Sequence, residues 1–222
     1  MGALKIERSM LPGAFRRKNA GHDLLHNGAL VAGRHFRAIE CHRRGSLDRA
    51  AGFVPQHHQH LNVERLDELC GDDVKVICIN NPDNPTGALL SKEKLEEIVA
   101  VARKHDAWLV CDEVYRLLTQ DGSYQESVVD LYDKGVVTSS MSKVWSLAGL
   151  RLGWCVTKSP ELRRALLSHR DYNLISCGMF DEAVAAYALE HADKILERSR
   201  KIVRQNFSAL MEWVESEPHL SV

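Results

Sequence analysis

Three short segments of this chain hold the side chains that are best suited to chemistry. The first is residues 80–87 (NNPDNPTG), where two X-Pro steps directly follow an apolar, strand-like run. X-Pro steps fix the backbone, and they are where cis peptide bonds occur. Asn, Pro and Gly are also the usual residues of a surface turn, so this segment alone does not distinguish a binding loop that presents Asn84 from an ordinary turn.

The second segment, residues 111–116 (CDEVYR), places Asp112 at the end of another apolar run. A carboxylate in that position is costly to desolvate unless it meets a cation. A helix cap or a surface acid is the commoner role of such an aspartate, and Tyr115 would also suit an ordinary core position. The segment is therefore a candidate site whose partner has to come from elsewhere.

The third segment, residues 139–153 (SSMSKVWSLAGLRLG), surrounds Lys143 with serines and carries Arg151 eight residues later. Hydroxyls and backbone N–H groups are directional donors, and arginine forms bidentate, charge-assisted pairs. This combination suits a bound phosphate group. A solvated basic loop is the weaker alternative, because an apolar strand closes the segment.

The elements that position these segments alternate along the chain after residue 60. Apolar runs predict strands at 74–79, 107–111, 135–139 and 152–157, and helical periodicity predicts helices at 61–73, 91–105, 160–169, 180–190 and 192–214. The alternation predicts an α/β protein, a three-layer α/β/α sandwich with a mostly parallel mixed sheet. In such sheets the ligand crevice lies beyond the carboxyl ends of the strands, so all three segments should converge there.

Composition excludes several classes of protein. No apolar run reaches the roughly 18 residues of a membrane span, and the six cysteines form no CxxC pair, which indicates reduced thiols and a cytoplasmic protein. Residues 1–60 carry ten basic and four acidic residues, a net charge of +6, without helical periodicity or interleaved aromatics. We therefore predict no nucleic-acid binding. A mitochondrial targeting segment is a weaker alternative to an aberrant N-terminus.

Histidines in the N-terminal region have ligand-like spacing but lack the cysteine or carboxylate partners of a zinc site, so no metal is predicted; they are His22, His26, His57, His58 and His60. The change in pattern near residue 60 divides the chain into three parts. We expect residues 1–60, to which no function is assigned, to be disordered or aberrant, residues 61–190 to form the ligand-binding portion, and residues 191–222 to form a long helix leading away from it.

Together the NPTG, DEVY and SMSK…GLRLG motifs resemble the class I/II aminotransferases of the aspartate aminotransferase superfamily, which are pyridoxal-phosphate (PLP) enzymes of fold type I. Asp112 follows Asn84 by 28 residues and Lys143 follows Asp112 by 31, in the family's order and at family-like spacing. The resemblance covers residues 64–222. It implies the PLP-dependent large domain, an aminotransferase that acts on amino acids and 2-oxo acids, and a homodimer when full-length.

The resemblance also implies roles for individual residues. Lys143 would form an imine with the cofactor aldehyde and, once freed by substrate, act as general base. Asp112 would pair with the protonated pyridine nitrogen, which keeps the ring electron-accepting. Asn84 and Tyr115 would hydrogen-bond the phenolate oxygen of the ring.

Three further positions match the phosphate-binding residues of the family: Ser140, Ser142 and Arg151. Other expected parts are not visible in the sequence: a phosphate-cradling turn, an aromatic that stacks on the ring, and an arginine for the substrate carboxylate. We therefore expect the chain to be a fragment whose long helix at 191–222 leads towards a missing small domain, with no readable substrate. The alternatives are a PLP-dependent lyase, cyclase or oxidase, and a non-catalytic remnant; the effector domain of a transcription regulator would need an upstream winged helix, which residues 1–60 do not supply.

Overall fold

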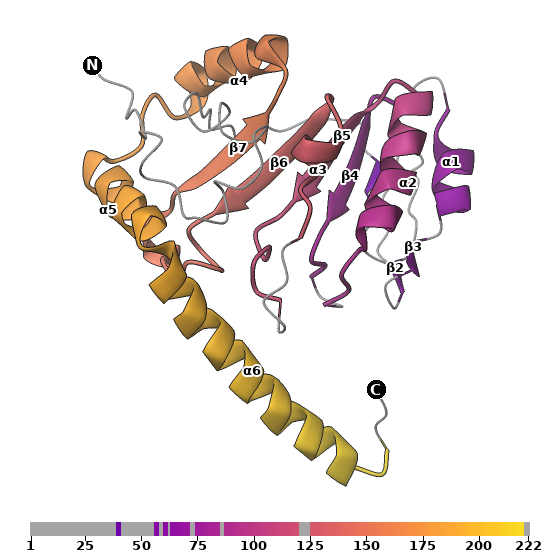
Figure 1. The fold of residues 1–222 in the computed structure, drawn as a ribbon. Helices are drawn as coiled ribbons and strands as arrows, with labels where there is room; N and C mark the ends of the chain where they lie inside the picture. Colours follow the sequence, from indigo (N-terminus) through magenta and orange to yellow (C-terminus); the bar gives the residue numbers. More distant parts are fainter. Residues whose placement is uncertain are drawn as a thin grey trace.

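A five-stranded mixed sheet forms the centre of the molecule (Figure 1). The computed structural model describes residues 39–40, 56–57, 60–61, 63–71, 74–84, 87–119 and 125–219. In spatial order the strands of the sheet are β1 (Ile39–Glu40), β4 (Val76–Asn80), β5 (Trp108–Asp112), β6 (Gly135–Ser140) and β7 (Gly153–Thr157). The first four are parallel and β7 is antiparallel to β6. A separate antiparallel pair consists of β2 (Gln56–His57) and β3 (His60–Leu61).

Helices flank this sheet. They are α1 (Val63–Leu69), α2 (Lys92–Lys104), α3 (Val128–Leu131), α4 (Pro160–Asn173), α5 (Met179–Glu190) and α6 (Ala192–Ser216), with a short 3₁₀ turn, η3, at Ala148–Leu150. In Figure 1, α1 to α3 lie at the side of β4 and β5, α4 lies next to β7, and α6 projects away from the sheet. The mostly parallel α/β architecture predicted from the sequence is confirmed.

Helix α2 shows why the predicted elements form where they do. Ser91 caps its N-terminus by accepting a hydrogen bond from the Lys94 N–H (3.2 Å), and basic Arg103 and Lys104 occupy its last turn, where they complement the helix dipole. The face that carries Leu95 and Ile98 is fully buried against the sheet. The helix therefore follows the predicted range, 91–105, within one residue at each end.

The register of the parallel strands brings their carboxyl ends to one edge of the sheet. Asn80 of β4 lies beside Asp112 of β5, which lies beside Thr138 of β6. The chain continues this ladder beyond the strands, because the Asn81 N–H donates to the Asp112 carbonyl (3.0 Å) and the Glu113 N–H donates to the Thr138 carbonyl (2.9 Å). This edge is where the chemistry-bearing segments leave the sheet.

A second apolar core fixes the turn that contains Lys143. Met141, Val144 and Trp145 of this turn are buried against residues of α5 and α6, including Leu196. The Ser199 hydroxyl of α6 donates to the Val144 carbonyl at 3.0 Å. The long helix therefore supports the turn from behind.

Some elements differ from the sequence prediction. Helix α1 starts after the predicted residue 61 because Leu61 pairs with Gln56 in the β2–β3 ladder, and it ends at Leu69 rather than at the predicted residue 73. The four-residue α3 and the two-residue β1 were not predicted, since neither is long enough to show a period. Helix α4 runs on from the predicted end at residue 169 to Asn173. The rest of the N-terminal region, for which disorder was considered, lies outside the described residues.

Cysteine side chains within the described ranges are all free. Cys70, Cys111 and Cys155 are buried, as expected for reduced thiols, whereas Cys78 and Cys177 are half-buried. Burial raises the pKa of the Cys155 thiol to about 11, so that thiol stays protonated at neutral pH. Over the same ranges, no helix has both the length and the apolarity needed to cross a membrane, and no three His, Cys, Asp or Glu side chains are grouped as metal ligands.

Candidate active site

The loop that carries Asn84 is held in place by its own hydrogen bonds. The Asn81–Pro82 peptide bond is cis, as the two X-Pro steps suggested. The buried Asn81 side chain accepts a hydrogen bond from the Leu90 N–H at 2.9 Å, and the Asp83 N–H donates to the Ala88 carbonyl at 2.8 Å. The loop therefore presents Asn84 from a fixed backbone at the end of β4.

Asn84, Tyr115 and Lys143, which belong to three different sequence segments, are brought together. The Asn84 Nδ2 donates to the Tyr115 hydroxyl at 3.3 Å, although 31 residues separate the two in the chain. The Lys143 Nζ lies over the Tyr115 ring, 5.9 Å from its centroid. The Lys143 side chain is exposed, so its amine is accessible. An amide, a phenol and a primary amine therefore surround one point at the sheet edge.

Asp112 is the last residue of β5 and lies at the same edge. Its Oδ1 accepts a hydrogen bond from the Val114 N–H at 3.0 Å. Burial raises the pKa of its carboxyl, and the hydrogen bond from Val114 partly opposes this. No lysine or arginine in the described part of the chain forms an ion pair with it. A partly buried carboxylate in this state would be stabilised by a cationic ligand group.

Asn80 is a residue that sequence reasoning passed over. It pairs in register with Asp112, and its Oδ1 is buried without a hydrogen-bond donor among the described groups. Such an acceptor is rare in a folded protein and marks a place where an outside donor would be favourable. Its position at the end of the strand, four residues before Asn84, was the only signal in the sequence.

Ser140, Ser142 and Arg151 lie where β6 ends and β7 begins. The Ser142 N–H donates to the Ser140 hydroxyl at 3.3 Å, and Arg151 has left-handed backbone angles (φ 52°, ψ 32°) that close the turn before β7. Because Ser140 pairs with Gly153, the turn places Arg151 two residues from the partner of Ser140. The exposed Arg151 guanidinium donates to the Ala148 carbonyl at 2.8 Å.

The packing of this turn requires a glycine at position 153. A Cβ on Gly153 would lie 2.8 Å from the Ser139 carbonyl oxygen, too close for any other residue without a backbone shift. The Met141 N–H also donates to the Leu152 carbonyl at 3.0 Å. The end of β6 and the start of β7 are therefore held tightly together next to the serines.

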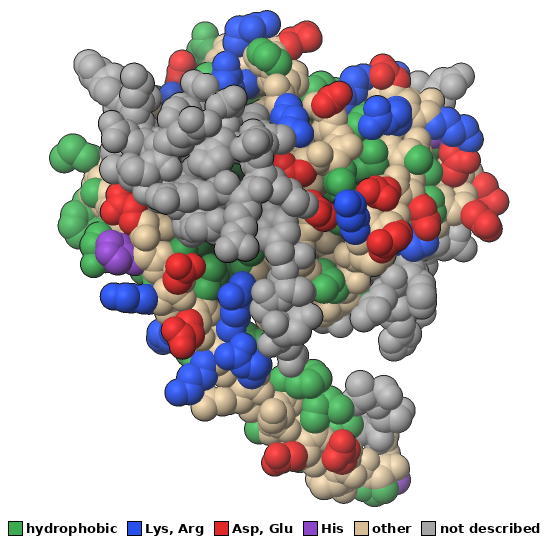
Figure 2. Space-filling view, viewed as in Figure 1, with side chains coloured by type: hydrophobic (Ala, Val, Ile, Leu, Met, Phe, Trp, Pro, Cys, Tyr) green, Lys and Arg blue, Asp and Glu red, His purple; other side chains and the backbone are tan. Residues whose placement is uncertain are grey.

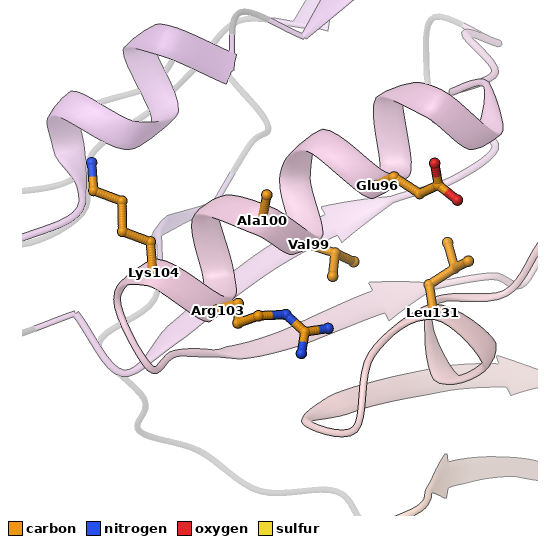
Figure 3. A pocket seen from close by; sticks show the side chains of 6 residues that line it. All are labelled: Glu96, Val99, Ala100, Arg103, Lys104 and Leu131. Atoms are coloured by element: carbon orange, nitrogen blue, oxygen red, sulfur yellow. The ribbon is translucent and has the colours of Figure 1, made fainter.

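A shallow hollow on another part of the surface is unconnected with these residues. It lies along α2 beside α3 (Figure 3), and its lining residues are Glu96, Val99, Ala100, Arg103, Lys104 and Leu131. It contains none of the candidate residues, it is open to solvent, and its charged side chains lie along the exposed face of α2. We do not assign it a role.

Comparison with known families agrees with this geometry. Residues 42–219 match the family described as aminotransferase class I and II. The chain belongs to this family. The match begins well before residue 64, where the motifs had placed the start of the resemblance, so part of the basic N-terminal region also belongs to the aminotransferase pattern.

The chain matches only part of the length of each relative. The kynurenine–oxoglutarate transaminase of Dictyostelium discoideum is 31% identical over 156 residues, which are 68% of this chain and 35% of that enzyme. A PLP-dependent aminotransferase from Streptococcus suis is 40% identical, with a TM-score of 0.68 over 72% of this chain and 42% of that one. The PLP-bound C-S lyase of Staphylococcus hominis, 23% identical with a TM-score of 0.66 over 75% of this chain and 44% of that one, shares the fold. The chain thus spans less than half the length of these relatives.

A buried carboxylate supports the DEVY segment through contacts with a later part of the chain. Glu113 follows Asp112 directly and accepts hydrogen bonds from the Ser127 hydroxyl (2.9 Å) and the Val128 N–H (3.1 Å). The Arg116 Nε lies 3.5 Å from its Oε2. Burial raises the pKa of Glu113, and the nearby Arg116 charge opposes this. The network ties the turn that holds Tyr115 to the start of α3.

We expect Glu113→Ala to destabilise the protein by about 3 kcal/mol, because it removes the anion beside the Arg116 guanidinium and leaves the two buried donors of Ser127 and Val128 without their acceptor. Glu113→Gln, which retains an oxygen acceptor, should have a smaller effect. Urea unfolding followed by circular dichroism measures both. Glu96→Ala, at an exposed α2 position, is the control and should change the unfolding free energy by only a few tenths of a kcal/mol. Equal effects of Glu113→Ala and Glu96→Ala would contradict a supporting role.

Proposed function

We propose that this chain is the cofactor-binding portion of a PLP-dependent aminotransferase that acts on amino acids and 2-oxo acids. The observation that carries the proposal is the convergence of Asn84, Tyr115 and Lys143 at the sheet edge where Asp112 ends β5. Membership of the class I and II aminotransferase family supports the same reaction.

The donor set fits pyridoxal phosphate. When bound, this cofactor supplies an aldehyde and an electron-withdrawing ring that stabilises negative charge at the substrate α-carbon. A carboxylate without a cation at Asp112 suits the pyridine nitrogen, an amide and a phenol at Asn84 and Tyr115 suit a ring oxygen, and the exposed amine of Lys143 suits the aldehyde.

Lys143 has two tasks in this proposal. Its amine would hold the cofactor covalently in the resting protein and, once freed by a substrate amine, would take up and return the proton of the α-carbon. The buried Met141 and Val144 on either side restrict where the amine can reach.

The remaining candidate residues hold and orient the cofactor. Asp112 would keep a positive charge on the ring nitrogen, while Asn84 and Tyr115 would donate to the ring oxygen. Ser140, Ser142 and Arg151 bind the phosphate: the two hydroxyls donate directionally and the guanidinium neutralises charge. To bind the phosphate, the Arg151 guanidinium turns its N–H donors towards it, including the donor that is now bonded to the Ala148 carbonyl.

For the whole protein we propose a cytoplasmic homodimer whose ligand-binding portion is residues 61–190 and whose α6 leads towards a second domain. The buried free thiols at Cys70, Cys111 and Cys155 support a reducing compartment. The covered fractions of the relatives, 35% and 42%, support further parts beyond this portion.

Product analysis tests the reaction class. With PLP, an amino acid and a 2-oxo acid, transamination exchanges the two: the amino acid is lost and a new one appears, with no net release of ammonia. A lyase of this fold would instead cleave a side-chain bond, an oxidase would release ammonia, and a cyclase would give a ring product. Mass spectrometry of a panel of amino acids distinguishes these outcomes. A folded chain that binds PLP and turns over no member of the panel would support the non-catalytic alternative.

A further inference from the structure

Two turns carry the side chains that the proposed function assigns to the ring oxygen and the aldehyde. Tyr115 lies in the turn that follows β5, and Lys143 lies in the turn that follows β6. The ladder between these neighbouring strands ends where the Glu113 N–H donates to the Thr138 carbonyl at 2.9 Å. Beyond that point the ladder no longer fixes the distance between the two turns, so another element has to fix it.

Each of these turns contains a non-glycine residue with a positive φ. Leu117 has φ 81° and Ser146 has φ 58°. A residue with a Cβ rarely adopts such angles, and it keeps them only where its surroundings fix the backbone. Residues in this state cluster at functional sites. The contacts that hold Leu117 and Ser146 are therefore candidates for a role at the site.

Two neighbouring residues of α6 make those contacts. The Arg200 Nε donates to the Leu117 carbonyl at 2.8 Å, across 83 residues of sequence. The Ser199 hydroxyl donates to the Val144 carbonyl at 3.0 Å and lies 3.4 Å from the Ser146 hydroxyl. Because the single hydrogen of the Ser199 hydroxyl is used at Val144, the Ser146 hydroxyl is the donor in the second contact. One place on α6 thus contacts both turns.

Burial distinguishes Ser199 and Arg200 from the solvated face of the helix. Figure 2 shows Lys and Arg side chains, in blue, gathered on the part of α6 nearer the body. Four of the five basic residues of α6 are exposed, whereas Arg200 is half-buried. Ser199 is 7% exposed, and Leu117, Val144 and Leu196 of α6 belong to one apolar core. A guanidinium is costly to withdraw from water unless its donors are used, and here one is used on the Tyr115 turn.

We propose that Ser199 and Arg200, the α6 clamp, are positioning residues that set the separation of Lys143 and Tyr115. This assignment rests on the proposed function, from which Lys143 and Tyr115 take their roles. Arg200 fixes the backbone two residues after Tyr115, and Ser199 fixes it one residue after Lys143. Because both side chains belong to one helix, they hold the Lys143 Nζ and the Tyr115 ring at their observed separation of 5.9 Å. Groups that must meet one cofactor lose much of their effect when they are misplaced by about 1 Å.

Hydrogen exchange followed by mass spectrometry tests the α6 clamp in the cofactor-free 222-residue chain. Both turns contain backbone hydrogen bonds of their own, so their amides report local opening. Arg200→Met should speed exchange in residues 113–118 about fivefold, and Ser199→Ala should do so in residues 141–147, because each loses the bond that fixes its turn. Peptides from β4 and β5 should exchange as in wild type.

Two further variants separate the α6 clamp from a general effect on stability. Arg198→Met is the matched control, since Arg198 is exposed and lies two residues earlier on α6. Arg200→Lys retains a donor and should restore most of the protection in residues 113–118. Unchanged exchange in both turns, or an equal increase in Arg198→Met, overturns the proposal. Faster exchange throughout the sheet in both Arg200 variants would show a general role in stability and would also overturn it.

A double-mutant cycle tests whether Arg200 acts through Tyr115, with the dissociation constant of PLP from equilibrium dialysis as the readout. Arg200→Met and Tyr115→Phe should each weaken PLP binding about fivefold, the effect of one hydrogen bond. Independent effects would multiply to about 25-fold, whereas positioning through Tyr115 predicts no more than about tenfold for the double variant. Multiplying effects overturn the positioning role. A wild-type chain that binds no PLP contradicts the proposed function instead, and hydrogen exchange then decides the α6 clamp by itself.

Discussion

Lys143→Ala is expected to abolish covalent capture of pyridoxal phosphate. In the wild-type chain, reduction with borohydride after incubation with the cofactor should leave one cofactor on the peptide that contains Lys143, because its exposed amine lies with Asn84 and Tyr115 at the sheet edge. Peptide mass spectrometry detects the modification. If the protein turns over amino acids, the same substitution should lower the rate about 10²- to 10⁴-fold, the usual contribution of a positioned acid–base group.

Two variants separate a specific role for Lys143 from a loss of charge or fold. Lys143→Arg retains the positive charge over the Tyr115 ring and should also fail to capture the cofactor. Lys158→Ala removes a lysine that directly follows β7 and should leave capture unchanged. A reduced adduct that persists on another peptide in Lys143→Ala, at wild-type yield, would contradict the assignment.

Much of the fold was predictable because its elements are long and buried. The five-residue strands β4 and β5 are continuous apolar runs bounded by turn residues, and α2 has a cap, a dipole-matched charge order and a periodic apolar face. By contrast β1 has two residues and α3 has four, and no periodic signal exists at such lengths. The α1 boundary was misplaced because Leu61 satisfies a helical period as well as a strand pairing, and only the tertiary partner Gln56 decides between them.

The candidate site shows a different limit. Sequence motifs indicated which residues converge, because the carboxyl ends of parallel strands meet at one edge, and the Asn84–Tyr115 contact follows that expectation. They did not indicate the role of Glu113, because the Ser127 hydroxyl and the Val128 N–H that donate to it lie 14 and 15 residues later in the chain, and no motif connects them to it. Nor did they reveal that the Asn80 amide oxygen lies buried beside Asp112 without a donor.

The prediction of next largest effect concerns Asp112. A substitution at this position should slow amino-acid turnover without preventing covalent capture of the cofactor. Asp112→Asn retains the shape of the side chain and an oxygen that can still accept from the Val114 N–H. It removes the negative charge that would hold a proton on the pyridine nitrogen. We therefore expect borohydride capture at Lys143 to persist while the rate of amino-acid turnover falls about 10²- to 10³-fold, the effect of removing one preorganised electrostatic contact.

Deuterium exchange at the substrate α-carbon measures this step directly, because loss of that proton depends on how well the ring accepts electrons. Asp133→Asn, an exposed acid in the turn before β6, is the matched control and should exchange at the wild-type rate. Burial raises the pKa of the Asp112 carboxyl, so a chain without a cationic ligand should hold a proton there at a higher pH than an exposed aspartate does. A bound cationic group should lower the pKa of this carboxyl again in wild type. Asp112→Asn has no carboxyl at this position, so a bound cation should cause no such change there. Exchange by Asp112→Asn at the wild-type rate would mean that the charge at the end of β5 plays no part in the chemistry.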